Sequence, residues 1–466
     1  MEFRVEEDSL GNKKVPANAY YGIHTQRSIE NFPISRLRMP FELIRAIAAI
    51  KQACALANNE LGFIDSSRAK AIVRASLEIQ EGKFNSQFPL DVFQAGSGTS
   101  TNMNVNEVIA SRASQFMGGR KGQRSLVHPN DHVNKGQSTN DVIPSAIRIA
   151  SSRKLGQLLL NLELLRKTLK KKGREFEDII KSGRTHLQDA VPIALGQEFN
   201  AYAAAVEKHI TRLKNIRIFL SQLGIGGNAV GTGLNTHPDF RKLIIRNVNK
   251  ITGMEFSIAK DGIEATHSLT DFAELSAHLK LIAIDLNRIA NDLRLMSSGP
   301  ETGFHEINLP AVEPGSSIMP GKINPSIAEA VNMACHRTIG NDATITMSAA
   351  AGQLELNTHM PVVGYALLES LELMANSAKI FAEKCISGIT ANAEQCRWYV
   401  EHSMAMATAL NPYIGYDNAA KIVKEAVQKG KTIREVAAEQ NVLPSEELNR
   451  VLEPKSMIRP NLKKRR

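Results

Sequence analysis

Residues that could bind an anion gather at four places along the chain. Three of them, residues 96–102, 137–141 and 184–189, are rich in Ser, Thr, Asn and Asp. These residue types cap helices, and the spacing of Thr185 and Gln188 matches a capping box, so each segment predicts a helix start. Capping alone explains any one of them. Several helix N-termini aimed at one point would also hold a dicarboxylate, because each presents unpaired N–H groups and positive dipole density.

The fourth place is a long connection rich in Gly and Pro, residues 298–325, which is too long for a simple link between helices and is therefore expected to be functional. Its end reads Gly315-Ser316-Ser317-Ile318-Met319-Pro320-Gly321-Lys322-Ile323-Asn324-Pro325. This motif resembles the signature of the fumarase/aspartase superfamily, whose members eliminate a group from C2 of a succinate-like substrate and release fumarate. The resemblance extends over nearly the whole chain, from residues 19–22 to residues 410–412.

The resemblance implies catalytic roles for four residues. Ser316 matches the catalytic base of the family. A serine hydroxyl is a poor base near neutral pH, so Ser316 would act as an oxyanion, stabilised by backbone N–H groups of its loop and by Lys322 as a nearby cation. His186 would lie near the leaving group, and Glu329 matches the acidic partner that orients this histidine.

The resemblance also implies two sets of substrate-binding residues. Removal of the C3 proton makes the adjacent carboxylate a dianionic aci-carboxylate, which requires preorganised donors. The family positions that hold this carboxylate match Thr99, Ser138 and Thr139. The positions that hold the other carboxylate match Thr185, Lys322 and Asn324. The set of substrate-binding residues also includes Ser97 and Asn140, and Asn140 would lie near the leaving group. A second, peripheral anion site of the family resembles His128, Asn130 and Asp131.

Two branches of the superfamily compete for this sequence. The aspartate ammonia-lyase branch is favoured by residues 20–25, by Thr139 within 138–141, and by residues 351–357. The class II fumarate hydratase branch is favoured by residues 26–28, 96–98 and 321–322. The balance predicts reversible deamination of L-aspartate to fumarate and ammonia by anti β-elimination, and the alternative is hydration of fumarate to L-malate.

The elements that must position these residues are long helices. Apolar residues recur at helical spacing in four segments, 155–169, 199–220, 275–293 and 367–381. Narrow apolar seams of this kind predict a mainly helical protein with a central bundle. Apolar seams that stay uncovered within one chain would pack against identical subunits. We predict an N-terminal mixed helical domain over residues 1–140, a central bundle over 141–394 and a small helical domain over 395–466. The resemblance implies a homotetramer with a twenty-helix core, in which three subunits contribute to each active site.

Composition and motifs exclude several other functions. Lys and Arg number 57 and Asp and Glu number 47, a net charge of +10, but aromatic residues are not interleaved with the basic ones as nucleic-acid binding requires. The basic run 463–466 is expected to be a solvated end. The glycines at 224–233 lack the dinucleotide-binding spacing and predict a tight turn between long helices. Residues 315–322 lack the Walker pattern.

Cofactor and location follow from simple sequence features. The four cysteines, Cys54, Cys335, Cys385 and Cys396, lack CxxC spacing, so neither a zinc site nor a disulfide framework is expected. No organic cofactor is expected, and no ligand cluster indicates activation by a divalent cation. The N-terminus has no secretory apolar region, and no stretch is apolar over 18 residues, so we expect a cytoplasmic protein that does not span a membrane.

Overall fold

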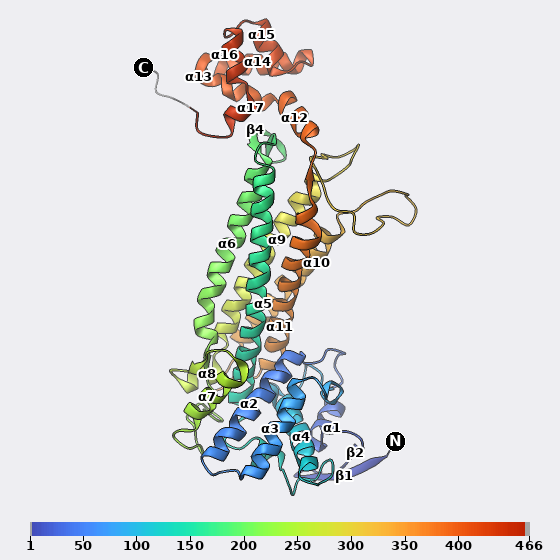
Figure 1. The fold of residues 1–466 in the computed structure, drawn as a ribbon, viewed down its shortest axis with the longest axis vertical. Helices are drawn as coiled ribbons and strands as arrows, with labels where there is room; N and C mark the ends of the chain where they lie inside the picture. Colours follow the sequence, from blue (N-terminus) through green and yellow to red (C-terminus); the bar gives the residue numbers. More distant parts are fainter. Residues whose placement is uncertain (1, 462–466) are drawn as a thin grey trace. The chain divides into compact units, whose positions relative to one another are not determined.

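The computed structural model describes residues 2–461 and is mainly helical, as predicted (Figure 1). The basic run 463–466 lies outside the described residues. The described chain forms two compact units. Unit 1 consists of the residues up to Leu159 with Thr211–Ala283 and His336–Ala375, and unit 2 consists of Leu160–Ile210, Ile284–Cys335 and the residues from Asn376 onward. No described helix combines the length and the apolar character that a membrane span needs.

Unit 1 begins with an antiparallel hairpin of β1 (Phe3–Asp8) and β2 (Gly11–Pro16), with Phe3 opposite Pro16. The helices that follow are α1 (Ile23–Asn31), α2 (Phe41–Glu60), α3 (Ser66–Gln80) and α4 (Thr99–Phe116). Short helical turns lie between them or just after, namely η1 (Asn85–Gln87), η2 (Gly96–Gly98) and η3 (Pro129–Val133). Helix α2 packs against α3 and against α7 (Phe240–Thr252), which explains why most of its residues are buried.

Five long helices contain residues of both units: α5 (Thr139–Glu175), α6 (Leu195–Leu220), α9 (Thr270–Met296), α10 (Ser326–Ala350) and α11 (Met360–Ile380). The predicted seams on α5, α6, α9 and α11 are confirmed, since residues such as Leu162, Leu213 and Leu286 are buried. Within unit 1, Arg148 pairs with Asp271 at 2.7 Å and joins α5 to α9.

The apolar periodicity did not reveal α10 as a long helix. Many of its buried positions are polar, including Asn332, Thr338, Asn341, Asp342 and Ser348. These side chains are buried because partners on neighbouring helices satisfy them, as where Ser276 on α9 donates to Asp342 at 2.8 Å. A search for apolar residues alone therefore misses this helix.

Unit 2 contains the hairpin of β3 (Ile180–Thr185) and β4 (Gln188–Ala194) and the short pair β7 (Ile307–Asn308) and β8 (Thr390–Ala391). Beyond α11 the chain continues through η4 (Phe381–Cys385), η5 (Ile386–Gly388), α12 (Ala393–His402), η6 (Met404–Leu410), α13 (Asn411–Ile414), α14 (Tyr416–Lys429), α15 (Ile433–Glu439), α16 (Ser445–Val451) and α17 (Pro454–Met457). Leu410, Ile422, Val436 and Leu452 form a separate buried cluster among these last helices. The predicted boundaries near 140 and 394 stay predictions.

The prediction of a helix start at residues 184–189 is wrong. Thr185 and Gln188 face each other across a hairpin turn formed by His186 and Leu187. Both turn residues have positive φ, 56° and 57°, as in the two-residue turns whose twist matches that of the flanking strands. Two residues three apart can form a capping box or flank such a turn, so the spacing alone did not distinguish the two structures.

Candidate active site

Ser316 lies in an irregular loop, residues 309–325, between β7 and α10 in unit 2. Its Oγ accepts hydrogen bonds from the backbone N–H groups of Ile318 at 3.2 Å and Met319 at 2.9 Å. Two donors on one hydroxyl oxygen stabilise its ionised form. The turn thus supplies one of the two conditions predicted for a serine that acts as a base.

The shape of this loop depends on contacts around Gly315. The Gly315 N–H donates to the Lys322 carbonyl at 2.8 Å, and Asn324 Nδ2 donates to the Gly315 carbonyl at 2.6 Å. A Cβ at position 315 would lie 2.5 Å from the Lys322 carbonyl oxygen, so the crossing requires glycine. The Lys322 side chain is exposed, and Asn324 keeps a second N–H for a substrate carboxylate.

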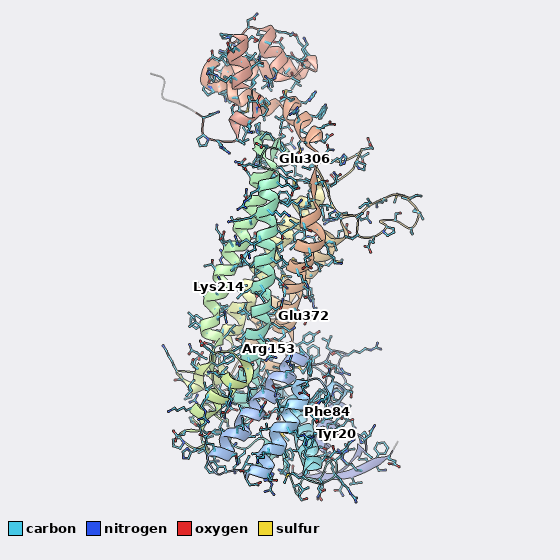
Figure 2. The ribbon with its side chains drawn as sticks, in the orientation of Figure 1. Tyr20, Phe84, Arg153, Lys214, Glu306 and Glu372 are labelled. Carbon is cyan, nitrogen blue, oxygen red and sulfur yellow. The ribbon has the colours of Figure 1, made fainter. Side chains whose placement is uncertain are left out.

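Thr185 and His186 lie at the tip of the β3–β4 hairpin, and both are exposed. The hairpin is anchored by a buried ion cluster, in which Glu306 accepts from Arg184, close to the turn, at 2.8 Å and pairs with Lys181, closer to the open end, at 3.1 Å. Glu306, which is labelled in Figure 2, is fully buried and directly precedes β7. The cluster therefore connects the hairpin that carries His186 to the strand from which the Ser316 loop starts.

Glu329 occupies the first turn of α10, where its carboxylate lies 3.9 Å from Arg294 Nη2. Within the part of one chain that the structure describes, Glu329 forms no ion pair with His186. The pairing of these two residues, which the resemblance implies, stays a prediction.

In unit 1, the predicted helix start at residues 137–141 is confirmed, because α5 begins at Thr139. The Asn140 N–H donates to Ser138 Oγ at 3.2 Å, and the Ser138 N–H donates to Asp141 Oδ1 at 2.9 Å. Thr139 is buried, and its Oγ1 accepts from Asn102 Nδ2 at 3.1 Å. The three residues predicted to bind substrate thus form one ordered turn.

Asp141 is the buried support of this turn. Its second oxygen, Oδ2, accepts from the N–H groups of Gly226 at 2.9 Å and Asn228 at 2.8 Å. Burial raises the pKa of Asp141 to about 6, although these hydrogen bonds oppose the shift. The segment 224–233 lies between α6 and α7, as predicted, but it forms a long loop and not a tight turn. The side chains of Asp141 and Asn140 are both hydrogen-bonded to this loop.

Ser97 and Thr99 lie together at the start of α4, with their hydroxyl oxygens 3.4 Å apart. Ser97 has a φ of 58°, and its N–H donates to the Thr358 carbonyl at 2.8 Å. Thr358 directly follows residues 351–357, so a segment that distinguishes the two branches lies next to a predicted carboxylate site. The helix predicted to follow residues 96–102 is α4, and it begins at Thr99, within this polar segment.

Sequence reasoning missed Lys51, a fully buried lysine on α2. Its Nζ donates to Asn134 Oδ1 at 2.8 Å and to Gln137 Oε1 at 2.9 Å, directly before the Ser138 turn. Burial lowers the pKa of Lys51 to about 7. The available signal was a lysine directly after the apolar run 46–50, where an unpaired charge is costly.

The predicted secondary anion site lies at η3. His128 Nδ1 accepts from the N–H groups of Asn130 at 3.3 Å and Asp131 at 3.2 Å, so the histidine itself caps the turn. The exposed Asp131 carboxylate lies 3.2 Å from the same nitrogen. Anion binding at these residues stays a prediction, and an anion would compete with contacts already formed.

The candidate residues therefore form preorganised clusters on both units. Ser97, Thr99, His128, Asn130, Asp131, Ser138, Thr139 and Asn140 lie in unit 1, and Thr185, His186, Ser316, Lys322, Asn324 and Glu329 lie in unit 2. The family model for lyases matches residues 11–340, a range that includes all of these residues, and the model for the fumarase C C-terminus matches residues 406–459.

The chain belongs to the fumarase/aspartase superfamily of lyases. Members of this superfamily match it over nearly their full length. It is 46% identical over 461 residues to aspartate ammonia-lyase of Bacillus subtilis, covering 99% of this chain and 97% of the relative. It is 44% identical over 466 residues to aspartate ammonia-lyase of Escherichia coli, covering 99% and 98%.

Solved structures of the superfamily show the same fold. The recombinant class II fumarase of Schistosoma mansoni superposes with a TM-score of 0.95 at 40% sequence identity, covering 98% of this chain and 99% of that one. Both branches considered from the sequence are thus among the similar proteins. Among residues 2–461, no group of three or more His, Cys, Asp and Glu side chains is placed to hold a metal ion.

Proposed function

We propose that this protein catalyses the reversible deamination of L-aspartate to fumarate and ammonia. The observation that carries the proposal is the Ser316 turn, in which two backbone N–H groups converge on one hydroxyl oxygen in a chain of this superfamily. Such an oxygen is suited to remove the C3 proton of a succinate-like substrate.

The proposed reaction is an anti β-elimination. Ser316 takes the proton from C3, and the electron pair moves into the adjacent carboxylate to form the aci-carboxylate. Thr99, Ser138 and Thr139 hold this dianion, and their fixed hydrogen bonds mean that little reorganisation is needed when the charge develops. The C2–N bond then breaks, and fumarate and ammonia leave. Thr185, Lys322 and Asn324 hold the other carboxylate, with His186 and Glu329 near the leaving group.

Ammonia is the favoured leaving group because the similar proteins of Bacillus subtilis and Escherichia coli are aspartate ammonia-lyases. Residues 20–25, Thr139 and residues 351–357 support the same choice. The second candidate is hydration of fumarate to L-malate, which is supported by the similarity to a class II fumarase and by residues 96–98 and 321–322.

A paired assay distinguishes the candidates. The purified protein is incubated with L-aspartate or with L-malate, and fumarate is followed by its absorbance. Fumarate from L-aspartate alone supports the proposal, whereas fumarate from L-malate alone replaces it with the second candidate and leaves the Ser316 mechanism in place. Fumarate from neither substrate contradicts both.

We further propose a cytoplasmic homotetramer with active sites shared by three subunits. Large apolar side chains are exposed on the long helices, including Leu160 at 68%, Met333 at 66% and Met347 at 75%. Exposed apolar residues along one set of helices support association with identical subunits. Light scattering tests the assembly, which should have four times the chain mass of 51.1 kDa. We also propose that no cofactor is needed, so activity should survive dialysis against a chelator.

A further inference from the structure

The β3–β4 hairpin has a bulge between its open end and its tip. The register shifts between Ser182 and Gly183, which leaves Val191 of β4 without an opposite residue on β3. A Cβ at position 183 would lie 2.6 Å from the Val191 carbonyl oxygen, so the close approach of the two strands requires glycine. A bulge bends a hairpin and increases its local twist. The direction of the tip is therefore set at this bulge.

Two cations on opposite sides of the bulge share one carboxylate. Lys181, on the side of the open end, lies 3.1 Å from Glu306 Oε2, and Arg184, on the side of the tip, donates to Glu306 Oε1 at 2.8 Å. Residues three apart on a regular strand point to opposite faces. The bend and twist of the hairpin between them bring both side chains to the same carboxylate. Glu306 thus bridges the bulge, with one oxygen for each side.

Glu306 is itself fixed through its backbone. Its N–H donates to the Met296 carbonyl at the end of α9, and its carbonyl accepts from the Asn392 N–H directly before α12, both at 2.9 Å. Its side chain is fully buried. The Arg184 guanidinium also packs over the Phe304 ring, 4.3 Å from the ring centroid. Glu306 is therefore a fixed point to which the tip side of the hairpin is held.

We propose that Glu306 is a positioning residue that acts through Arg184 to set the direction of the hairpin tip, and with it the positions of Thr185 and His186. This inference rests on the proposed function, in which these two tip residues act on the substrate. Thr185 directly follows Arg184, and residues 185–189 are all exposed, so the tip gains little support from packing. The ion pair on the tip side of the bulge supplies that support, because it fixes the last residue before the tip.

Steady-state kinetics of folded variants test this inference. Arg184→Met removes the ion pair on the tip side but leaves Glu306 paired with Lys181. We expect kcat/KM for L-aspartate to fall about a hundredfold, because a displaced tip misplaces the groups that act on the substrate. Arg184→Lys keeps a cation at this position and should recover about tenfold of the loss. Lys455→Met, which removes an exposed ion pair with Asp178 just before β3, is the matched control and should leave kcat and KM unchanged.

A second pair of variants tests the bulge itself and covers the case in which Arg184→Met does not fold. Gly183→Ala keeps both cations of Glu306 but places a Cβ 2.6 Å from the Val191 carbonyl oxygen, so the strands must shift. It should lower kcat/KM about tenfold. Val191→Ala shortens an exposed side chain at the same bulge without a change to the backbone, and it should keep the kinetics of the wild type.

The outcomes separate this inference from the proposed function. Circular dichroism shows which variants are folded. Wild-type kcat/KM in the folded Arg184→Met and Gly183→Ala proteins would overturn the inference, because Arg184 and the bulge would then contribute to stability alone, and it would leave the proposed function intact. A wild-type protein that forms no fumarate from L-aspartate would overturn the proposed function first, and this inference with it.

Discussion

Arg184 and Glu306 form an ion pair of 2.8 Å between residues 122 positions apart, close to the turn of the hairpin that carries His186. The Arg184 guanidinium also lies over the Phe304 ring at 4.3 Å, and Lys181 approaches the same carboxylate. A fully buried carboxylate between two cations is costly to disturb, because removal of its charge takes a partner away from both Arg184 and Lys181, although Lys181 keeps its pair with Glu198 at 3.1 Å.

Glu306→Gln is therefore expected to lower the free energy of unfolding by about 3 to 5 kcal/mol. Urea unfolding followed by circular dichroism measures the change. Glu425→Gln, which removes the exposed carboxylate paired with Lys429, is the control and should hardly move the midpoint. Equal losses in the two variants would contradict the assignment of Glu306 as the main anchor.

Ser316→Ala should reduce kcat by about a thousandfold, because the proposed general base is removed. The crossing of the loop at Gly315 should be kept, since the contacts of Gly315 with Lys322 and Asn324 do not involve the serine side chain, although Ile318 and Met319 lose their acceptor. The control is retained protection from thermal unfolding by succinate, which shows that the variant still binds a dicarboxylate. Near-normal turnover in a folded Ser316→Ala protein would exclude the serine as the base.

Lys51 should make stability depend on pH. Its pKa is lowered to about 7 in the folded protein, from an ordinary value of 10.5, so between these values the unfolded chain binds more protons. Stability should therefore rise from pH 7 toward pH 10.5, and this gain is lost as the pH falls through 7.

Lys51→Met should remove this slope, as measured by urea midpoints at several pH values. Lys214→Met, on an exposed position of α6, is the control and should keep the slope of the wild type. The same slope in the wild type and in Lys51→Met would show that Lys51 does not titrate as its burial indicates.

Leu187 should tolerate only particular substitutions. Its φ of 57° lies in the left-handed region, which is unfavourable for β-branched residues and open to glycine. Leu187→Val is expected to lower the free energy of unfolding by about 1 to 2 kcal/mol relative to Leu187→Gly. Thermal unfolding of the pair provides the measurement, and a valine variant as stable as the glycine variant would contradict the turn geometry.

The features that the sequence predicted were those encoded by neighbouring residues. Apolar spacing located α5, α6, α9 and α11, and the polar segment 137–141 marked the start of α5. Lys51, the hydrogen bond of Asn140 with the carbonyl of Ala229 and the ion pair of Arg184 with Glu306 were not predicted, because each depends on a partner far along the chain. The same applies to α10, whose buried polar residues have an explanation only once their neighbours are known.

The contact of Asp141 with Gly226 spans 85 residues, and this separation has a consequence for folding. The turn of Ser138, Thr139 and Asn140 is complete only after the segment between Asp141 and Gly226 has folded and brought these two residues together. The entropy cost of closing such a long loop is met before the contacts across it contribute stability. Local helix formation can start α5 early, but the turn at its start, which we propose to bind substrate, should mature late. During refolding, the protein should therefore begin to bind a dicarboxylate only after most of its helical circular dichroism signal has returned.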